Sequence, residues 1–369
     1  MGDEVATAER SPQRSQLIES LKKAGFVIGS GLLCFIAARN SLTWHLQRFW
    51  GASGDFWQAC WQKFVREVFN DDPFLTGFIG TLCATIATYW VLNAFFIFMD
   101  VTGYPKALQK YKVQDDQNVP VDPYKLRRAI KLVLFNQLVT SPPFFYLSYL
   151  VMRWRGCEFG GELPHFHWVV WEIFVMTWVE EFCFYYSHRL LHHPRIYKYI
   201  HKRHHEWTAP ISITSIYAHP FEHVVSNMLG PVLGVIVCGS HVATAWLWFA
   251  IAIASTTVAH CGYHLPFLPS PEAHDFHHLK FNWNFGVLGV LDRLHGTDAA
   301  FRNSKAYERH FMLLSLVPVK TTVPDEPKKK FYSSSTSSSG DEDFASGEDG
   351  PASSNRIRSK RRVTRKVVM

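Results

Sequence analysis

Histidine is the residue type whose number and spacing could do chemistry in this sequence. Fourteen of the 19 histidines lie between residues 188 and 278 of the 369-residue chain. Neutral imidazole is a ligand well suited to iron, copper and zinc. The question is therefore whether the spacing of these histidines lets them meet around metal ions.

Three histidine boxes and two histidine pairs have the spacing that puts side chains on one face of a helix. In "HRLLH" the histidines are four residues apart, and "HKRHH" and "HDFHH" share the spacing i, i+3, i+4. The box histidines are His188, His192, His201, His204, His205, His274, His277 and His278. The pairs are His219 with His223 in "HPFEH" and His260 with His264 in "HCGYH". One such pair often arises by chance, whereas three boxes indicate a metal site.

The number of histidines exceeds what a single ion can use. It fits a pair of metals, each with four or five nitrogen ligands. Zinc would support hydrolysis without redox chemistry, whereas iron with open coordination positions can activate dioxygen. No nucleophile elbow, phosphate-binding loop or dinucleotide-binding glycine pattern lies near the boxes. Taken singly, four further histidines are predicted to be structural: His193, His241, His295 and His310.

Long uncharged runs predict that membrane helices position these boxes. Residues 73–99 have no charge and exceed the ~20 residues needed to cross a bilayer, and residues 132–152 form a second run, with a kink expected at Pro142 and Pro143. Residues 24–38 form a short span or an interfacial segment, residues 163–179 are apolar apart from Glu172, and residues 224–259 form a hairpin broken at "CGSH". The predicted fold is an all-α integral membrane protein, a bundle of four to six membrane helices with a cytosol-facing helical cap that carries the histidine boxes.

The distribution of charge predicts the orientation and the segments of the chain. The basic loop 104–131 should be cytosolic, which returns residues 187–222 and 260–310 to the same side. The predicted segments are a polar start (1–23) without a signal peptide, membrane helices with an aromatic interfacial loop (24–164), the histidine-box domain (165–310), and a disordered Ser-rich acidic tail with a basic end (323–369). The net charge is +7, and the basic residues lie beside apolar runs. This placement favours a role at the membrane boundary over nucleic-acid binding. Seven cysteines without a C-x-x-C pair argue against a disulfide framework or a thiolate zinc site.

The boxes and their surroundings resemble the fatty acid hydroxylase/sterol desaturase superfamily of membrane non-haem di-iron enzymes. The stretches that carry the resemblance are "HRLLHHPRIYKYIHKRHHEWTAP", "YAHPFEH", "HCGYH" and "HDFHHLKFNWNFG". They are most similar to the sterol C-4-methyl oxidase branch, over about residues 165–300. The resemblance implies two iron ions, held by the eight box histidines together with His260 and His264. It also implies O2, electrons from NAD(P)H, and an endoplasmic reticulum membrane with the boxes facing the cytosol.

The resemblance has departures that bear on the substrate and on the electron donor. Sterol C-4 oxidases more often read "HSGYD", with Asp where this chain has His264, and they lack a histidine at His223. The chain has no "HPGG" signature of a fused haem domain, so cytochrome b5 and its reductase are implied as separate carriers. Further candidates for metal binding or for hydrogen bonds to the ligands are His219, His223, Glu180, Glu181, Glu206 and Asp275.

The leading functional hypothesis is oxidation of the C-4 methyl group of sterol intermediates. The alternative within enzymes is hydroxylation or desaturation of a fatty acyl, sphingoid or ether lipid. A metal transporter is disfavoured because transporter ligands lie near the bilayer midplane, whereas these boxes lie in charged segments. A third possibility is an inactive relative that binds sterol and regulates other proteins.

Overall fold

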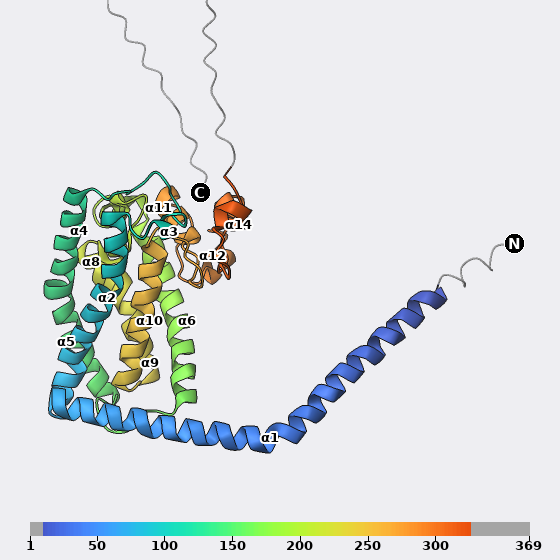
Figure 1. Cartoon of the computed structure of the whole chain (residues 1–369). Helices are drawn as coiled ribbons and strands as arrows, with labels where there is room; N and C mark the ends of the chain where they lie inside the picture. Colours follow the sequence, from blue (N-terminus) through green and yellow to red (C-terminus); the bar gives the residue numbers. More distant parts are fainter. Residues whose placement is uncertain (1–9, 326–369) are drawn as a thin grey trace, which may run out of the picture. The chain divides into compact units, whose positions relative to one another are not determined.

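The computed structural model describes residues 10–325, and in this range the chain is helical, with one isolated bridge between Lys112 and Tyr263 and no named strand. Figure 1 shows the long helices, of which α2, α4, α5, α6, α9 and α10 run side by side and α1 lies across one end of them. Their bounds are α1 Arg10–Phe69, α2 Thr81–Thr102, α4 Pro123–Phe135, α5 Ser141–Arg155, α6 Phe166–Leu191, α9 Leu229–Cys238 and α10 Val242–His260. The shorter helices are α3 Lys106–Gln109, α7 Pro194–Tyr197, α8 Pro220–Glu222, α11 Glu272–Lys280, α12 Val290–His295, α13 Ala299–Arg302, α14 Lys305–Glu308 and α15 Val319–Thr322. The predicted disordered tail lies outside the described residues from position 326 onward.

Three helical ranges are long and apolar enough to cross a membrane: Leu75–Thr102, Pro220–Cys238 and Val242–His260. The first confirms the span predicted over residues 73–99. The other two form the predicted hairpin, which turns at Gly239 with φ of 67°. The predicted segments 132–152 and 163–179 lie in α4–α5 and α6, which join the same bundle but are not among these three ranges. The fold is that of the predicted all-α membrane protein, and three of its described helical ranges meet the length and hydropathy of a membrane span.

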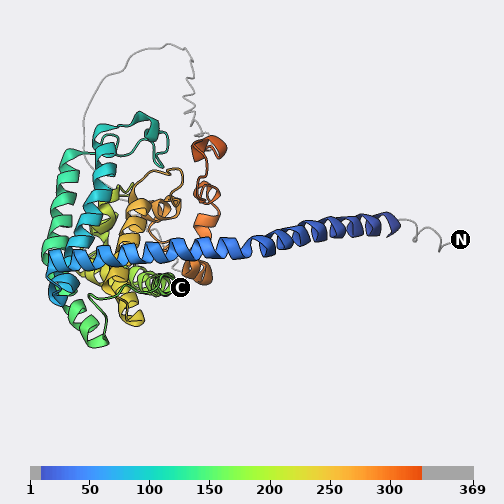
Figure 2. The same ribbon diagram turned by 60° about the horizontal axis from the view of Figure 1, so that its bottom comes forward.

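The N-terminal region differs from the prediction. We predicted a polar start, a short apolar segment and an interfacial loop, whereas residues Arg10–Phe69 form one continuous helix, α1. The physical reason is that no proline occurs between Pro12 and Pro73, and the glycines in this range lower the helix propensity without breaking the hydrogen-bond pattern. The C-terminal half of α1 lies across one end of the bundle (Figure 2), where the rings of Trp61 and Trp246 are 5.6 Å apart.

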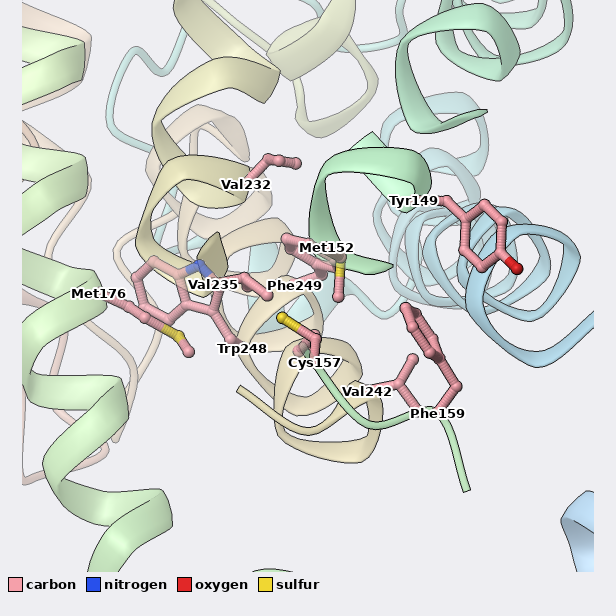
Figure 3. Packing of buried hydrophobic residues seen from close by; sticks show 11 residues of the cluster. Tyr149, Met152, Cys157, Phe159, Met176, Val232, Val235, Val242, Trp248 and Phe249 are labelled. Atoms are coloured by element: carbon pink, nitrogen blue, oxygen red, sulfur yellow. The ribbon is translucent and has the colours of Figure 1, made fainter. Parts of the chain in front are cut away.

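The bundle core forms where α5, α6, α9 and α10 meet. Met176 of α6, Val235 of α9 and Val242 at the start of α10 are completely buried, and Figure 3 shows them with the residues packed around them. Gly234 lets α9 approach α6 closely, since a Cβ there would lie 3.1 Å from the Cα of Met176. Close backbone approach through small residues is a common way to join helices in membranes.

Three π-helical segments occur in the described part of the chain, and one of them, Leu75–Gly80, precedes α2. Of the other two, the first, Asn136–Thr140, lies just before Pro142 and Pro143, so these prolines fall in the first turn of α5, where a missing N–H costs little. The predicted kink at the prolines therefore takes the form of a π-helical segment. The second, His223–Met228, links α8 to α9. Such segments occur frequently at functional sites.

A strap of residues 104–122 fastens the end of α2 to the chain that follows α10. Val113 N donates to Gly262 O at 2.9 Å, and His264 N donates to Tyr111 O at 2.8 Å. Beneath the strap, Lys112 and Asp100 form a buried ion pair with an Nζ–Oδ1 distance of 3.0 Å. The strap thereby fixes the segment that begins directly after His260.

Candidate metal centre

The predicted histidines converge at one end of the bundle. Within each of two groups, one nitrogen from every ring lies within 4.8 Å of the others. The first group consists of His188, His192, His201, His205 and His277, and the second of His204, His260, His274 and His278. The groups of five and four agree with the four or five nitrogens per metal that the sequence predicts.

The histidine boxes do not correspond one to one to the two groups. His188 is in the last turn of α6 and His192 is its C-terminal cap. The box "HKRHH" forms a 3-10 turn over His201–Glu206 rather than the predicted α-helical face. The "HKRHH" and "HDFHH" boxes are both divided between the groups. In α11, His274 and His278 face the second group while His277 joins the first.

The distances between ring nitrogens match those of ligands around a metal ion. In the first group, Nε2 of His205 lies 3.1 Å from Nε2 of His201 and 3.1 Å from that of His277. In the second, Nε2 of His274 lies 2.8 Å from that of His260 and 3.2 Å from that of His278. Metal–nitrogen bonds of about 2.1 Å place neighbouring ligand nitrogens roughly 3.0 to 3.4 Å apart. The inner atoms therefore have the separations of a coordination shell.

Hydrogen bonds at the outer nitrogen fix the tautomer of six rings. In each, Nδ1 lies within hydrogen-bond distance of an acceptor oxygen, so Nδ1 carries the proton and Nε2 has the free lone pair. The pairs are His188 with Phe285 O (2.8 Å), His201 with Glu222 Oε1 (2.8 Å), His204 with Tyr217 O (3.4 Å), His260 with Thr256 O (2.8 Å), His277 with Trp283 O (2.7 Å) and His278 with Trp207 O (2.9 Å). Nε2 lone pairs of His188 and His201 then face each other at 3.1 Å. Two lone pairs at this distance repel unless a cation lies between them, so the donor set fits a metal.

Burial keeps these imidazoles in the neutral form that binds metal. Desolvation, with neighbouring imidazoles as a further cause, lowers the pKa of His192 to about 2. The same causes hold the pKa of His205 and of His277 well below the usual value. Because the rings are neutral at pH 7, no proton has to leave a ring before its Nε2 lone pair binds an ion.

The carboxylates around the site are arranged differently from the prediction. Glu222, which sequence reasoning missed, accepts from His201, although its place in "HPFEH" beside the boxes could have indicated it. Glu181 instead accepts the backbone N–H groups of Val287 and Leu288, in the loop before α12, at 2.8 and 2.7 Å, and that of Leu291 in the first turn of α12 at 3.0 Å. Asp275 accepts from the Gln114 side chain at 3.0 Å. The Glu206 carboxylate accepts from the Tyr217 hydroxyl at 2.8 Å.

Three of the predicted candidate histidines lie outside both groups. Nε2 of His264 lies 2.9 Å from Phe311 O, and its Nδ1 lies 3.4 Å from Glu272. His219 caps α8 by accepting from Phe221 N. His223 is buried in the π-helical segment that follows.

A partly open cavity of about 460 Å³ reaches the second group. Its walls come from α2, α5, α6, α9 and α10 and are mostly apolar, with Leu82, Phe145 and Trp248 among them. His260 and His274 are also part of the wall. A separate open hollow of about 570 Å³ reaches His192 of the first group from the surface, past Arg189. The two groups are thus approached by different routes.

The comparisons with known proteins identify the family. A model of the fatty acid hydroxylase family matches residues 173–297, which include every histidine of both groups. Fatty acid hydroxylase domain-containing protein 2 of Homo sapiens is 51% identical over 321 residues, 87% of this chain and 96% of that protein. The chain belongs to the fatty acid hydroxylase family. The sequence motifs also resemble this type of protein within the sterol C-4-methyl oxidase branch, and the alignment confirms that prediction.

Other members of the fatty acid hydroxylase family are more distant. Methylsterol monooxygenase 2-2 of Arabidopsis thaliana is 32% identical over 270 residues, 69% of this chain and 97% of that protein. Very-long-chain aldehyde decarbonylase GL1-11 of Oryza sativa subsp. indica is 34% identical over 257 residues, 63% of this chain and 93% of that protein. No solved structure matches the chain. Membership supports a membrane-embedded oxidoreductase of the lipid hydroxylase or desaturase type, in a family that is typically iron-dependent.

Proposed function

We propose that this protein is a lipid monooxygenase that uses O2 at a two-iron centre to hydroxylate a C–H bond, and that it acts on the C-4 methyl group of sterol intermediates. The observation that carries the proposal is the convergence of five and four imidazoles beside the end of an apolar cavity. A cavity of this size is within the usual range for small-molecule sites, roughly 300–1,000 Å³.

The proposed iron ligands are the members of the two histidine groups. Iron held in this way would supply the reduction of O2 that an attack on an unactivated C–H bond requires. The chain itself would hold each ring in its tautomer through the Nδ1 contacts. Its apolar cavity would keep water away and orient the hydrocarbon beside His260 and His274. We leave His264 out of the proposed set because it lies outside both groups.

The remaining parts of the proposal concern the electron donor and the location. We propose that electrons come from NAD(P)H through cytochrome b5 and its reductase, and that the histidines face the cytosol in the endoplasmic reticulum membrane. The open hollow at His192 supports a separate carrier, since it joins the first group to the surface without passing through the lipid cavity.

A second candidate is hydroxylation or desaturation of a fatty acyl, sphingoid or ether lipid. The similarity to very-long-chain aldehyde decarbonylases favours it, because those proteins are at least as similar to this chain as the methylsterol monooxygenase is. A sterol-binding regulator without activity is disfavoured by the complete set of converging imidazoles.

The test is complementation of cells that lack sterol C-4-methyl oxidase, with sterol profiling and iron measurement on the purified chain. We expect 4-methyl sterols to be cleared by the wild-type chain and not by His204→Ala. If iron is bound but 4-methyl sterols persist, the sterol assignment fails and the second candidate is tested by profiling acyl, sphingoid and ether lipids. A chain without iron would overturn the oxygenase itself.

A further inference from the structure

Four buried polar atoms in the cavity wall have no hydrogen-bond partner among the described residues. Oδ1 of Asp298 has an ion pair with Arg302 at 3.2 Å, which leaves Oγ of Ser215, Nδ1 of His223 and Oε2 of Glu180. All three residues line the cavity that reaches His260 and His274. A buried polar atom without a partner is unfavourable, so several in one apolar cavity indicate that something else binds there.

The contact between His223 and Ser141 fixes the tautomer of His223. The Ser141 hydroxyl donates its one proton to the carbonyl of Asn136 at 2.9 Å. Nε2 of His223 lies 3.1 Å from the same hydroxyl oxygen. Since that hydroxyl has no second proton, Nε2 of the neutral ring is the donor and Nδ1 has a free lone pair. His223 therefore offers the cavity a hydrogen-bond acceptor.

The surroundings of this acceptor select the kind of group it can bind. A carboxylate has no proton to donate to Nδ1, whereas a neutral hydroxyl can meet both Nδ1 and the carboxyl group of Glu180, which lines the same cavity. Gly230 makes room for that carboxyl group, because a Cβ there would overlap Oε2 of Glu180. A neutral hydroxyl can donate, and the apolar walls suit a hydrocarbon attached to it. The site therefore suits an alcohol rather than an acid.

His223 is also coupled by the chain to the metal groups. The preceding residue, Glu222, accepts from His201, and the carbonyl of Tyr217 lies 3.4 Å from Nδ1 of His204. The segment from Tyr217 to His223 thus contacts both groups and ends in the cavity. A hydroxyl bound at His223 would be held by the same segment that positions the imidazoles.

We propose that His223, with Glu180 also lining the cavity, is a hydroxyl-binding subsite that orients a neutral lipid alcohol, with its hydrocarbon directed toward His260 and His274. The proposal rests on the proposed function, because it assigns the substrate class of that same site. His223 would act as a specificity-determining residue through direct contact with the hydroxyl.

The test uses the iron-loaded full chain in detergent and two probes, a tritiated 4-methyl sterol alcohol and its O-methyl ether. The ether keeps the same hydrocarbon, carries one more methyl group at the oxygen and cannot donate, so we expect the wild-type chain to bind the alcohol about tenfold more tightly. His223→Leu should bind both probes with equal, weaker affinity, and His223→Gln should keep the preference because its amide can donate to Ser141 and accept from the hydroxyl. His219→Leu, in the same motif but outside the cavity wall, is the matched control and should keep the preference.

The outcomes separate this proposal from the function on which it rests. Equal binding of the two probes by the wild-type chain, or an unchanged preference in His223→Leu, would overturn the subsite. Turnover of lipid is measured in parallel with reductant and O2. If the chain oxidises lipid without distinguishing the probes, the oxygenase stands and the subsite falls. If it distinguishes them but oxidises no lipid, the subsite stands and the oxygenase falls. Should His223→Leu lose its iron, the wild-type and His223→Gln measurements still decide.

Discussion

At the scale of single residues, the site depends on which atom of each ring is protonated. The contact of Glu222 with His201 is the one contact with a carboxyl group among the Nδ1 bonds described for the two groups, and both partners are buried. Outer partners of metal-binding histidines orient the ring and raise its basicity. The carboxylate of Glu222 therefore belongs to the working site although it does not itself belong to either group.

Replacing Glu222 tests this role. Glu222→Leu removes the acceptor, and we expect iron affinity to fall by about 10- to 100-fold, measured by chelator competition and iron analysis. Glu206→Leu is the matched control, because its more exposed carboxylate hydrogen-bonds to Tyr217 and Arg128 instead of to a ring. Equal iron loss in both variants would contradict the assignment.

His204 and His264 were both predicted to bind iron, but replacing them should have different effects on the iron content. His204→Ala removes a member of the second group, so we expect iron content of the purified chain to fall by about half or more. His264→Ala should retain iron, because its ring lies against Phe311 and Glu272 outside both groups. Loss of iron in His264→Ala without loss of folded protein would restore it to the ligand set.

At the scale of elements, the strap 104–122 holds the chain that carries His260 and His264. Its anchor is the ion pair of Lys112 with Asp100, in which Tyr263 also donates to Asp100 Oδ1 at 3.0 Å. The Lys112 ammonium additionally lies 4.3 Å from the centroid of the Tyr263 ring. Buried pairs of this kind contribute little net stability when intact but are costly when one partner is lost.

Removing one partner of the strap's ion pair should therefore destabilise the fold. Asp100→Leu leaves the Lys112 charge unpaired, and we expect a loss of about 3–5 kcal/mol in the free energy of unfolding in detergent. The double substitution Asp100→Leu with Lys112→Met should recover most of the loss. A double variant as unstable as the single one would show that the pair acts by some other means than charge compensation.

At the scale of the whole molecule, the bundle separates an apolar cavity from a surface hollow, and each reaches one histidine group. The cavity is formed by helices far apart in the sequence. Ile86 of α2, Phe184 of α6 and Ala252 of α10 all line it. This arrangement predicts that the lipid can be blocked without disturbing the metal.

Filling the cavity tests that separation. Ala252→Phe places a ring in the cavity, and we expect lipid turnover to fall at least about tenfold because the hydrocarbon no longer fits, while iron content is unchanged. Leu247→Phe, on the exposed face of the same helix, is the control. Unchanged turnover in Ala252→Phe would show that the lipid reaches the site by another route.

The sequence by itself determined the features that depend on local pattern. Uncharged runs predicted the span 75–102 and the hairpin that turns at Gly239. The histidine boxes contained every member of the two groups apart from His260. The continuity of α1 was missed because an apolar stretch bounded by charges looks the same whether or not the helix continues through them. Helical spacing predicts a shared face, but it does not say which partner that face will meet.

Only the tertiary structure decided how the histidines are shared between the two groups. The contacts that do this join residues far apart in the chain, such as His260 with His204, 56 positions away, and His188 with Phe285, 97 positions away. The same long-range packing put Glu222 at the site and His264 outside it, and it placed His223 in the wall of the apolar cavity. Local spacing supplies the ligands, whereas the packing of distant helices chooses which atoms face one another.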